Sequence, residues 1–180
     1  MMLSLPPLTL VLGGAASGKS DYAERLVAAT QRPLVYVATA QAHDDEMTAK
    51  IARHKARRGK IWRTIEAPRN VTAALADVQP SGVVLFDCAT MWLSNQLLAQ
   101  ADIALEESDL LAALSACPAP VVVVSNEVGA GIVPENSLAR QFRQAQGELN
   151  QRIAARADLV LTVMAGLPLV LKGALPDNAP

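Results

Sequence analysis

The sequence predicts an α/β fold, a doubly wound and mostly parallel β-sheet with helices on both of its faces. Three observations support this prediction. Short runs of apolar residues recur along the chain, segments with helical spacing lie between them, and a glycine-rich motif joins the first run to the first of these segments. Strands that alternate with helices in this way form a parallel sheet, because each parallel pair needs a crossover connection.

Five apolar runs are the predicted strands. Each is only a few residues long, apolar at almost every position and rich in β-branched residues. This pattern is typical of strands that are buried on both faces. The runs are Leu8–Leu12, Leu34–Ala38, Val83–Phe86, Val121–Val124 and Leu159–Met164.

Helical spacing follows several of these runs. The predicted helices cover Asp21–Thr30, Asp44–Arg58 and about Leu138–Ala157, and Pro118 ends a further helix near Ser115. The tail after Pro168 holds two more prolines, so we expect it to end loosely.

Composition and length exclude several classes of protein. The chain has 180 residues, of which 51% are apolar and 18% are charged, which suits a single folded domain over 1–180 rather than a disordered chain. The net charge of −1 gives no general attraction to nucleic acid. No apolar stretch approaches the roughly 20 residues that cross a bilayer, and the two cysteines lack the spacing of a metal site or a disulfide framework. We therefore expect a cytoplasmic protein without a membrane span.

The glycine-rich motif has the pattern G-x-x-x-x-G-K-[ST] of a P-loop, which binds the phosphates of a nucleotide. It follows a predicted strand and precedes a predicted helix, where backbone N–H groups and the helix N-terminus can hold an anion. Lys19 is expected to reach the β- and γ-phosphates, and the Ser20 hydroxyl to bind Mg²⁺. The motif consists of Gly13, Gly14, Ala15, Ala16, Ser17, Gly18, Lys19 and Ser20.

Asp87 ends the third predicted strand, in the sequence VVLFD. Ligands of open α/β sheets gather at the carboxyl ends of the strands, and an acid there is the usual second ligand of the metal. The alternative is that Asp87 caps a helix that begins near Thr90. We favour the metal ligand.

The densest positive stretch of the chain surrounds His54, in the sequence KIARHKARRGK at Lys50–Lys60. Neighbouring cations keep an imidazole neutral and hence nucleophilic near neutral pH, so His54 could attack a phosphorus centre. Spacing alone favours the plainer interpretation, a solvated basic helix with an incidental histidine. Nucleic-acid contact is a third alternative, against which the near-neutral net charge speaks.

These residues, together with further blocks, resemble the bifunctional adenosylcobinamide kinase / adenosylcobinamide-phosphate guanylyltransferase family of cobalamin biosynthesis. The most specific block is SNEVGAGIVPEN at Ser125–Asn136. The other blocks occur in matching order along nearly the whole chain. They are Gly13–Ser20, ATAQ at Ala38–Gln41, DDEM at Asp44–Met47, His54 through Glu66, FDCATMWLSN at Phe86–Asn95 and the helix Leu138–Asp158.

The resemblance implies two reactions. Members phosphorylate the hydroxyl of adenosylcobinamide with ATP or GTP, and then join GMP from GTP to that phosphate, which gives adenosylcobinamide-GDP and pyrophosphate. The second reaction passes through a GMP–histidine intermediate, which His54 would form, with Lys19 as the other catalytic residue. The implied nucleotide contacts outside the P-loop are Thr39, Ala40, Gln41, Lys55, Ala56, Arg57, Arg58, Glu66 and Asp87.

Two positions depart from the family pattern. Ala16 stands where many relatives carry arginine, and Lys55 stands where arginine is common. The second change keeps the charge but loses bidentate geometry. Neither removes a catalytic atom, so we expect activity to survive.

The family also implies a homotrimer, which the residues themselves do not indicate. Two other functions fit the P-loop. One is a simple small-molecule kinase in which His54 only binds phosphate, and the other is a nucleotide-switched regulatory module without a nucleophile. A covalent nucleotide on the protein would separate both from the bifunctional enzyme.

Overall fold

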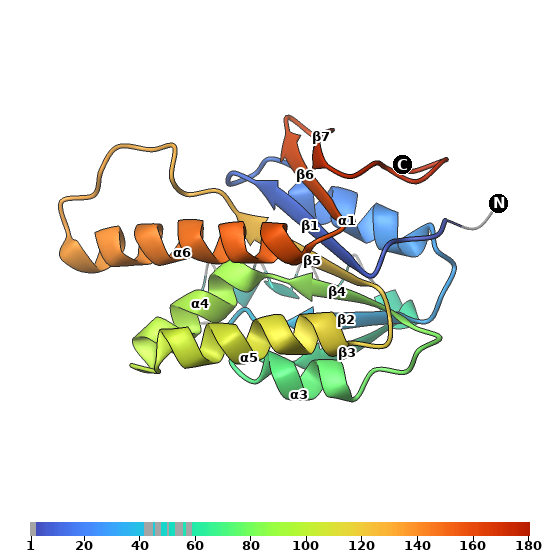
Figure 1. Cartoon of the computed structure of the whole chain (residues 1–180), viewed down its shortest axis with the longest axis horizontal. Coiled ribbons are helices and arrows are strands. Elements are labelled where there is room, and N and C mark those ends of the chain that lie inside the picture. The colour runs from blue at the N-terminus through green and yellow to red at the C-terminus, as the bar shows by residue number, and fades with distance from the viewer. Residues whose placement is uncertain (1–2, 42–44, 46–47, 50, 53–55, 57–58) are drawn as a thin grey trace.

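The computed structural model describes residues 3–41, 45, 48, 49, 51, 52, 56 and 59–180, and these form a seven-stranded sheet (Figure 1). The strand order is β3-β2-β4-β5-β1-β6-β7, and every neighbouring pair is parallel except β6 with β7. The predicted mostly parallel sheet is therefore confirmed. The strands are β1 Leu8–Gly13, β2 Leu34–Ala38, β3 Trp62–Glu66, β4 Val83–Asp87, β5 Val121–Asn126, β6 Leu159–Met164 and β7 Leu167–Lys172.

Helices cover both faces of this sheet, as predicted. In Figure 1 α3, α4, α5 and α6 lie in front of the strands and α1 lies behind them. The helices are α1 Lys19–Ala28, α3 Val71–Ala76, α4 Ala89–Leu98, α5 Ile103–Ala116 and α6 Ser137–Arg156, and a 3₁₀ turn, η1, covers Gly59–Ile61. The predicted helix Asp44–Arg58 lies largely outside the described residues.

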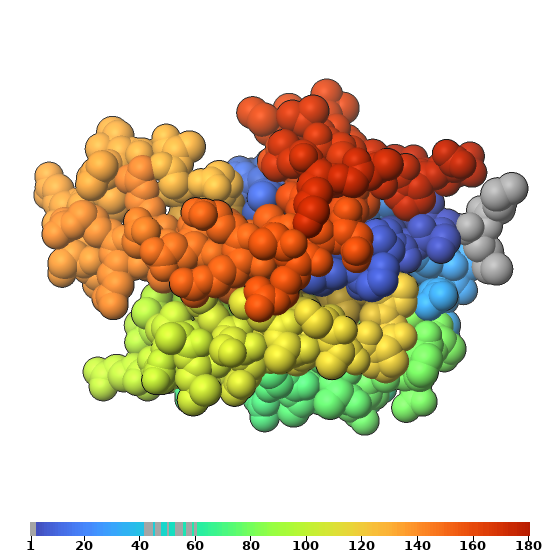
Figure 2. Space-filling model, viewed as in Figure 1, coloured from blue at the N-terminus to red at the C-terminus, as the bar shows by residue number. Residues whose placement is uncertain are grey.

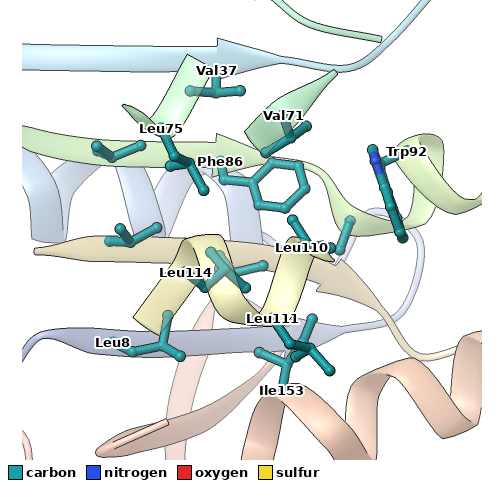
Figure 3. Close-up of a cluster of buried hydrophobic side chains, with 14 of the residues drawn as sticks. Leu8, Val37, Val71, Leu75, Phe86, Trp92, Leu110, Leu111, Leu114 and Ile153 are labelled. Atoms are coloured by element: carbon teal, nitrogen blue, oxygen red, sulfur yellow. The ribbon is translucent and has the colours of Figure 1, made fainter. Parts of the chain in front are cut away.

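Two hydrophobic clusters hold the layers together. The front cluster packs Phe86 of β4 against Leu75, Leu110 and Leu114 of α3 and α5 (Figure 3). The rear cluster packs Leu26 and its neighbours on α1 against β1, β4 and β5. Full burial of one such side chain contributes about 1.5–3 kcal/mol, so the central strands are the most firmly held part of the sheet.

The two edge strands were not among the predicted elements, and one prediction about them is wrong. β3 has only partly buried and exposed residues, so it lacks the apolar run that marks a buried strand. β7 lies in the tail that we expected to end loosely, yet it pairs with β6 and places Pro168 opposite Val163. Proline is tolerated there because β7 is an edge strand and needs fewer ladder hydrogen bonds.

Candidate active site

The loop between β1 and α1 carries the glycine-rich motif. Gly18 caps α1 with a φ of 90°, a left-handed conformation that glycine adopts without strain. A Cβ at Gly13 would lie 2.4 Å from the Ser17 Oγ, and one at Gly18 would lie 3.1 Å from the Cα of Gly166. The Ser17 side chain of the same loop therefore explains Gly13 on steric grounds, and the close approach of the β6–β7 turn explains Gly18.

Lys19 is the buried cation of this loop. Its exposed fraction is 9%, and its Nζ donates a hydrogen bond to the Gly14 carbonyl at 3.0 Å. The ammonium thus lies over the turn that precedes it. A buried cation in that place favours a phosphate group of a ligand, because burial strengthens the electrostatic attraction.

Ser17 supplies an independent sign that the loop fits a phosphate. Its Oγ is buried and has no hydrogen-bond partner among the residues that the structure describes. A buried hydroxyl without a partner costs about 1–3 kcal/mol. A phosphate oxygen within the loop would supply an acceptor for it.

Ser20 and Asp87 are the residues that fit Mg²⁺. Both offer oxygen, the donor that this ion prefers, and both are half-buried. The described residues contain no group of three or more His, Cys, Asp or Glu side chains that could hold a metal by themselves. An ion bound through one or two protein oxygens would take its other ligands from the phosphates and from water.

Asp87 ends β4, and β5 lies between β4 and β1 in the sheet. Sequence reasoning expected Asp87 on a strand next to that of the P-loop and also predicted β5, but it did not predict that β5 lies between the two. The Asp87 Oδ2 accepts a hydrogen bond from the Tyr36 hydroxyl at 3.0 Å. The alternative role of Asp87 as a helix cap is wrong, because Cys88 caps α4 through its Sγ, which accepts from the Met91 N–H.

Cys88 lies between the candidate metal ligand and α4. Burial and the neighbouring charge of Asp87 raise the pKa of the Cys88 thiol from 9.0 to about 12. The thiol therefore stays protonated near neutral pH and is unsuited to nucleophilic attack.

Thr39 and Asn95 form a clamp at the carboxyl ends of β2 and β3. The buried Thr39 hydroxyl donates to the Cys88 carbonyl at 2.7 Å and accepts from the Cys88 N–H at 2.8 Å. The Asn95 amide on α4 donates to the Thr39 carbonyl at 2.8 Å and to the Pro68 carbonyl at 2.9 Å. Thr39 is fully buried and its side chain serves the loop itself, whereas the neighbouring Ala40 is half-buried and Gln41 is exposed.

Glu66 reaches the same edge of the sheet. It lies opposite Ala38 in the register of β3 with β2, and Ala38 lies opposite Asp87 in the register of β2 with β4. The structure therefore brings the two predicted acids to one edge, with a single strand between them. Glu66 is exposed.

The predicted residues His54, Lys55, Arg57 and Arg58 lie outside the described residues. Ala56 is helical and exposed. The segment that contains them leaves the sheet after β2 and returns to it before β3, so the Thr39–Asn95 clamp holds the chain just before it.

A second polar network, which sequence reasoning missed, joins α4, β5 and α6 next to the P-loop. The Asn150 Oδ1 on α6 accepts from Ser125 Oγ at 2.6 Å and from Gln146 Nε2 at 2.9 Å, and its amide donates to the Asn126 carbonyl at 3.0 Å. The Thr90 hydroxyl accepts from the Asn126 N–H at 2.8 Å. The spacing of Gln146 and Asn150, four residues apart on one face of an otherwise apolar stripe, was the available signal.

This network continues into the P-loop through the backbone. Asn126 lies opposite Gly13 in the register of β5 with β1, and the next residue, Glu127, donates its N–H to the Gly13 carbonyl at 3.0 Å. The first glycine of the P-loop is thus held by the end of β5, which α4 and α6 hold in turn.

Two arginines of α6 hold the loop between β5 and α6. Arg140 donates to the Pro134 carbonyl at 3.0 Å, and Arg143 donates to the Gly129 carbonyl. Asn136 caps α6, since its side chain accepts from the Ala139 N–H.

Comparison with known proteins identifies relatives over almost the whole chain. The family description cobinamide kinase / cobinamide phosphate guanyltransferase matches residues 9–171. The bifunctional adenosylcobalamin biosynthesis protein CobP of Pseudomonas aeruginosa is 46% identical over 167 residues, which cover 91% of this chain and 96% of that protein. The protein CobU of Salmonella typhimurium, with the same description, is 45% identical over 92% of this chain and 99% of that protein.

Among solved structures, one from Pyrococcus horikoshii OT3 is similar in fold, with a TM-score of 0.54 and 8% identity over 96% of this chain and 88% of that one. The RadB recombinase gives a TM-score of 0.47 at 17% identity, over 96% of this chain and 82% of that one. None of the described helices is long and apolar enough to cross a membrane.

Proposed function

Because the chain belongs to the cobinamide kinase / cobinamide phosphate guanyltransferase family, we propose that it phosphorylates the hydroxyl of adenosylcobinamide with ATP or GTP and then transfers GMP through an intermediate at His54. The two activities, in adenosylcobalamin biosynthesis, come with membership of the family. The donor nucleotide, the covalent intermediate, the metal and the assignment of individual residues are the proposal.

The kinase step rests on the P-loop. Lys19 is buried with its ammonium over the loop, and Ser17 offers a buried hydroxyl without a partner among the described residues. Both suit a triphosphate. Ser20 and Asp87 would hold Mg²⁺, which neutralises charge that develops on the phosphates. The residues of the chain position the nucleotide and offset its charge, which is most of what phosphoryl transfer requires.

The guanylyl step would use His54 as the nucleophile. Its imidazole would attack the α-phosphorus of GTP, with pyrophosphate as the leaving group, and the phosphate of the acceptor would then displace the histidine. A covalent step divides one transfer between two bulky partners into two simpler displacements. Lys55, Arg57 and Arg58 would offset the charge of the phosphates, and Thr39 to Gln41, Ala56 and Glu66 would complete the nucleotide contacts.

Labelling with α-³²P-GTP and Mg²⁺ tests this proposal. We expect acid-labile, alkali-stable label on the wild-type protein, none from γ-labelled GTP, and none on a His54→Ala variant. His43→Ala is the matched control, since His43 is the other histidine of the chain, and it should retain the label. Absence of α-label on wild-type protein that binds GTP would overturn the covalent step and favour a simple kinase or a nucleotide switch.

A homotrimer in the cytoplasm is the remaining part of the proposal. Its support is an exposed apolar strip on the β6–β7 hairpin, formed by Met164, Leu167 and Leu169, whose exposed fractions are 68%, 72% and 58%. An exposed apolar edge strand is suited to contact another chain. Light scattering after gel filtration should give three times the mass of the chain, and Leu169→Lys should lower it. A monomeric wild-type protein would contradict this part.

A further inference from the structure

Glu127 is the first residue after β5 and lies beside the P-loop. Its N–H donates to the Gly13 carbonyl at 3.0 Å, and the next carbonyl of the loop, that of Gly14, accepts from Lys19 Nζ at 3.0 Å. The backbone of Glu127 and the Lys19 ammonium are thus attached to consecutive carbonyls of one turn. The start of the Glu127 side chain therefore lies beside the turn that we propose holds the phosphates.

Hydrogen bonds to the preceding residue and to its own side chain fix the position of Glu127. Asn126, which precedes it, is held by Thr90 through its N–H and by Asn150 through its carbonyl. The Glu127 Oε1 accepts from the Gly129 N–H. A Cβ at Gly129 would lie 2.7 Å from that Oε1, so the glycine leaves room for the carboxylate.

Glu127 also borders a cavity of about 400 Å³ between α6 and the β6–β7 hairpin. The apolar part of its wall includes Leu12, Ala154 and Val160, and polar groups at its border include Gln151 and Lys172. Figure 2 shows the surface hollowed between the loop after β5 and the red hairpin, with blue atoms of the β1 region at the bottom. A cavity of this size suits one arm of a large acceptor rather than a whole macrocycle.

Asp87, which also lies at this edge of the sheet, is less suited to proton transfer. Asp87 lies two strands from β1, already accepts from the Tyr36 hydroxyl and is the candidate metal ligand. Two carboxylates near one phosphate site can divide the work, one on the metal and one on the nucleophile.

We propose that Glu127 is the general base of the kinase step, with the hydroxyl-bearing arm of the cobinamide in the adjoining cavity. This rests on the proposed function. Glu127 takes the proton of the acceptor hydroxyl while the oxygen of that hydroxyl forms a bond to the γ-phosphorus. The bond from that phosphorus to the bridging oxygen breaks, and the nucleoside diphosphate leaves with the electron pair.

The test uses Glu127→Gln in the full chain, with Glu135→Gln on the same loop as the matched control. General-base catalysis typically contributes about 10²–10⁴-fold, so we expect kcat for cobinamide phosphorylation to fall by that factor in Glu127→Gln. The KM for cobinamide should change by less than about threefold, because a general base acts on the proton and does not bind the acceptor. The pH–rate profile should lose its acidic limb, and Glu135→Gln should retain wild-type kinetics.

A second variant separates position from charge. Gly129→Ala keeps the carboxylate but pushes it from its place, and the atom in the way is the end of a flexible side chain, so the fold should survive. We expect kcat to fall and thermal stability to stay as in the wild type.

Two controls distinguish the possible failures. Nucleotide affinity and α-label on the protein should be unchanged in Glu127→Gln, because neither needs the acceptor proton. Kinase activity within threefold of the wild type, or an unchanged acidic limb, would overturn the role of Glu127. Wild-type protein that binds nucleotide but phosphorylates no cobinamide would overturn the proposed function itself.

Discussion

The two polar networks at the carboxyl edge of the sheet differ in what they hold. The inner network, around Asn150, joins side chains of β5, α4 and α6 to one another and ends on the first glycine of the P-loop. The outer network, around Asn95, instead ties backbone carbonyls after β2 and β3 to α4. The inner network therefore supports the P-loop directly. The outer network instead holds the chain before and after the segment that joins β2 to β3.

We expect this difference to correspond to the two reactions. Ser17, Lys19 and Ser20, which we propose for the kinase step, belong to the P-loop that the inner network supports, and His54 lies in the segment between the two points that the outer network holds. If the networks serve separate steps, variants in one should change the ratio of the two activities in the opposite direction from variants in the other.

Lys19→Ala should lower activity more than any of the variants below, and it should affect both reactions. If one reaction kept its rate, the assignment of the two networks to the two reactions would need to change. Both steps act on a triphosphate, so loss of the buried ammonium should lower kcat/KM for kinase and for GMP–protein formation by about 10²–10³-fold each. Steady-state kinetics and α-label measure the two. Loss of the kinase alone would mean that GTP for the guanylyl step binds outside the P-loop.

Asn150→Ala should follow, with the kinase as the more affected activity. The change removes the acceptor for Ser125 and Gln146 and the donor to the Asn126 carbonyl, and leaving buried polar groups without partners costs about 2–4 kcal/mol of unfolding free energy. Urea denaturation and the kinase-to-label ratio measure the two effects. Gln144→Ala, an exposed change on the same helix, should leave both as they are.

Asn95 variants should lose more GMP–protein formation than kinase activity, the opposite of Asn150→Ala. Asn95→Ala loses two hydrogen bonds to carbonyls, at about 1–3 kcal/mol of stability, and should lower GMP–protein formation more than kinase activity. Asn95→Asp keeps the shape but puts a carboxylate oxygen where the amide donates to two carbonyls, so its effect should be larger. Equal losses of both activities would argue that the outer network is purely structural.

Cys88→Ser should have the smallest effect near neutral pH. The Cys88 thiol has a pKa of about 12 in the folded chain and about 9.0 when unfolded, so between these values only the unfolded chain loses the proton. Stability should therefore fall with rising pH, by up to about 1.4 kcal/mol per pH unit from this group. Denaturation curves from pH 8 to 11 should show a shallower fall for the serine variant. An identical fall in both proteins would mean that groups other than Cys88 cause the loss of stability at high pH.

Local sequence predicted most of the central fold. β1, β2, β4, β5 and β6 were predicted within two residues because strands buried on both faces must be apolar at nearly every position. β3 and β7 were missed because an edge strand is defined by its hydrogen-bond partner and not by its own burial. α3 was not predicted, and of α5 only the end near Ser115 was.

The sequence by itself determined the glycine-rich loop, since its proposed chemistry is local: Gly13, Gly18 and Lys19 would act on a phosphate through one turn and the helix that follows. Only the tertiary structure decided that β5 lies between β4 and β1, and hence that Glu127 lies beside the loop. It also decided that Asn95 and Asn150, ordinary helical residues in the sequence, hold the backbone at the two ends of the candidate site. The physical reason is that a hydrogen bond between residues far apart in the chain leaves no periodic signal, because its partner is chosen by packing.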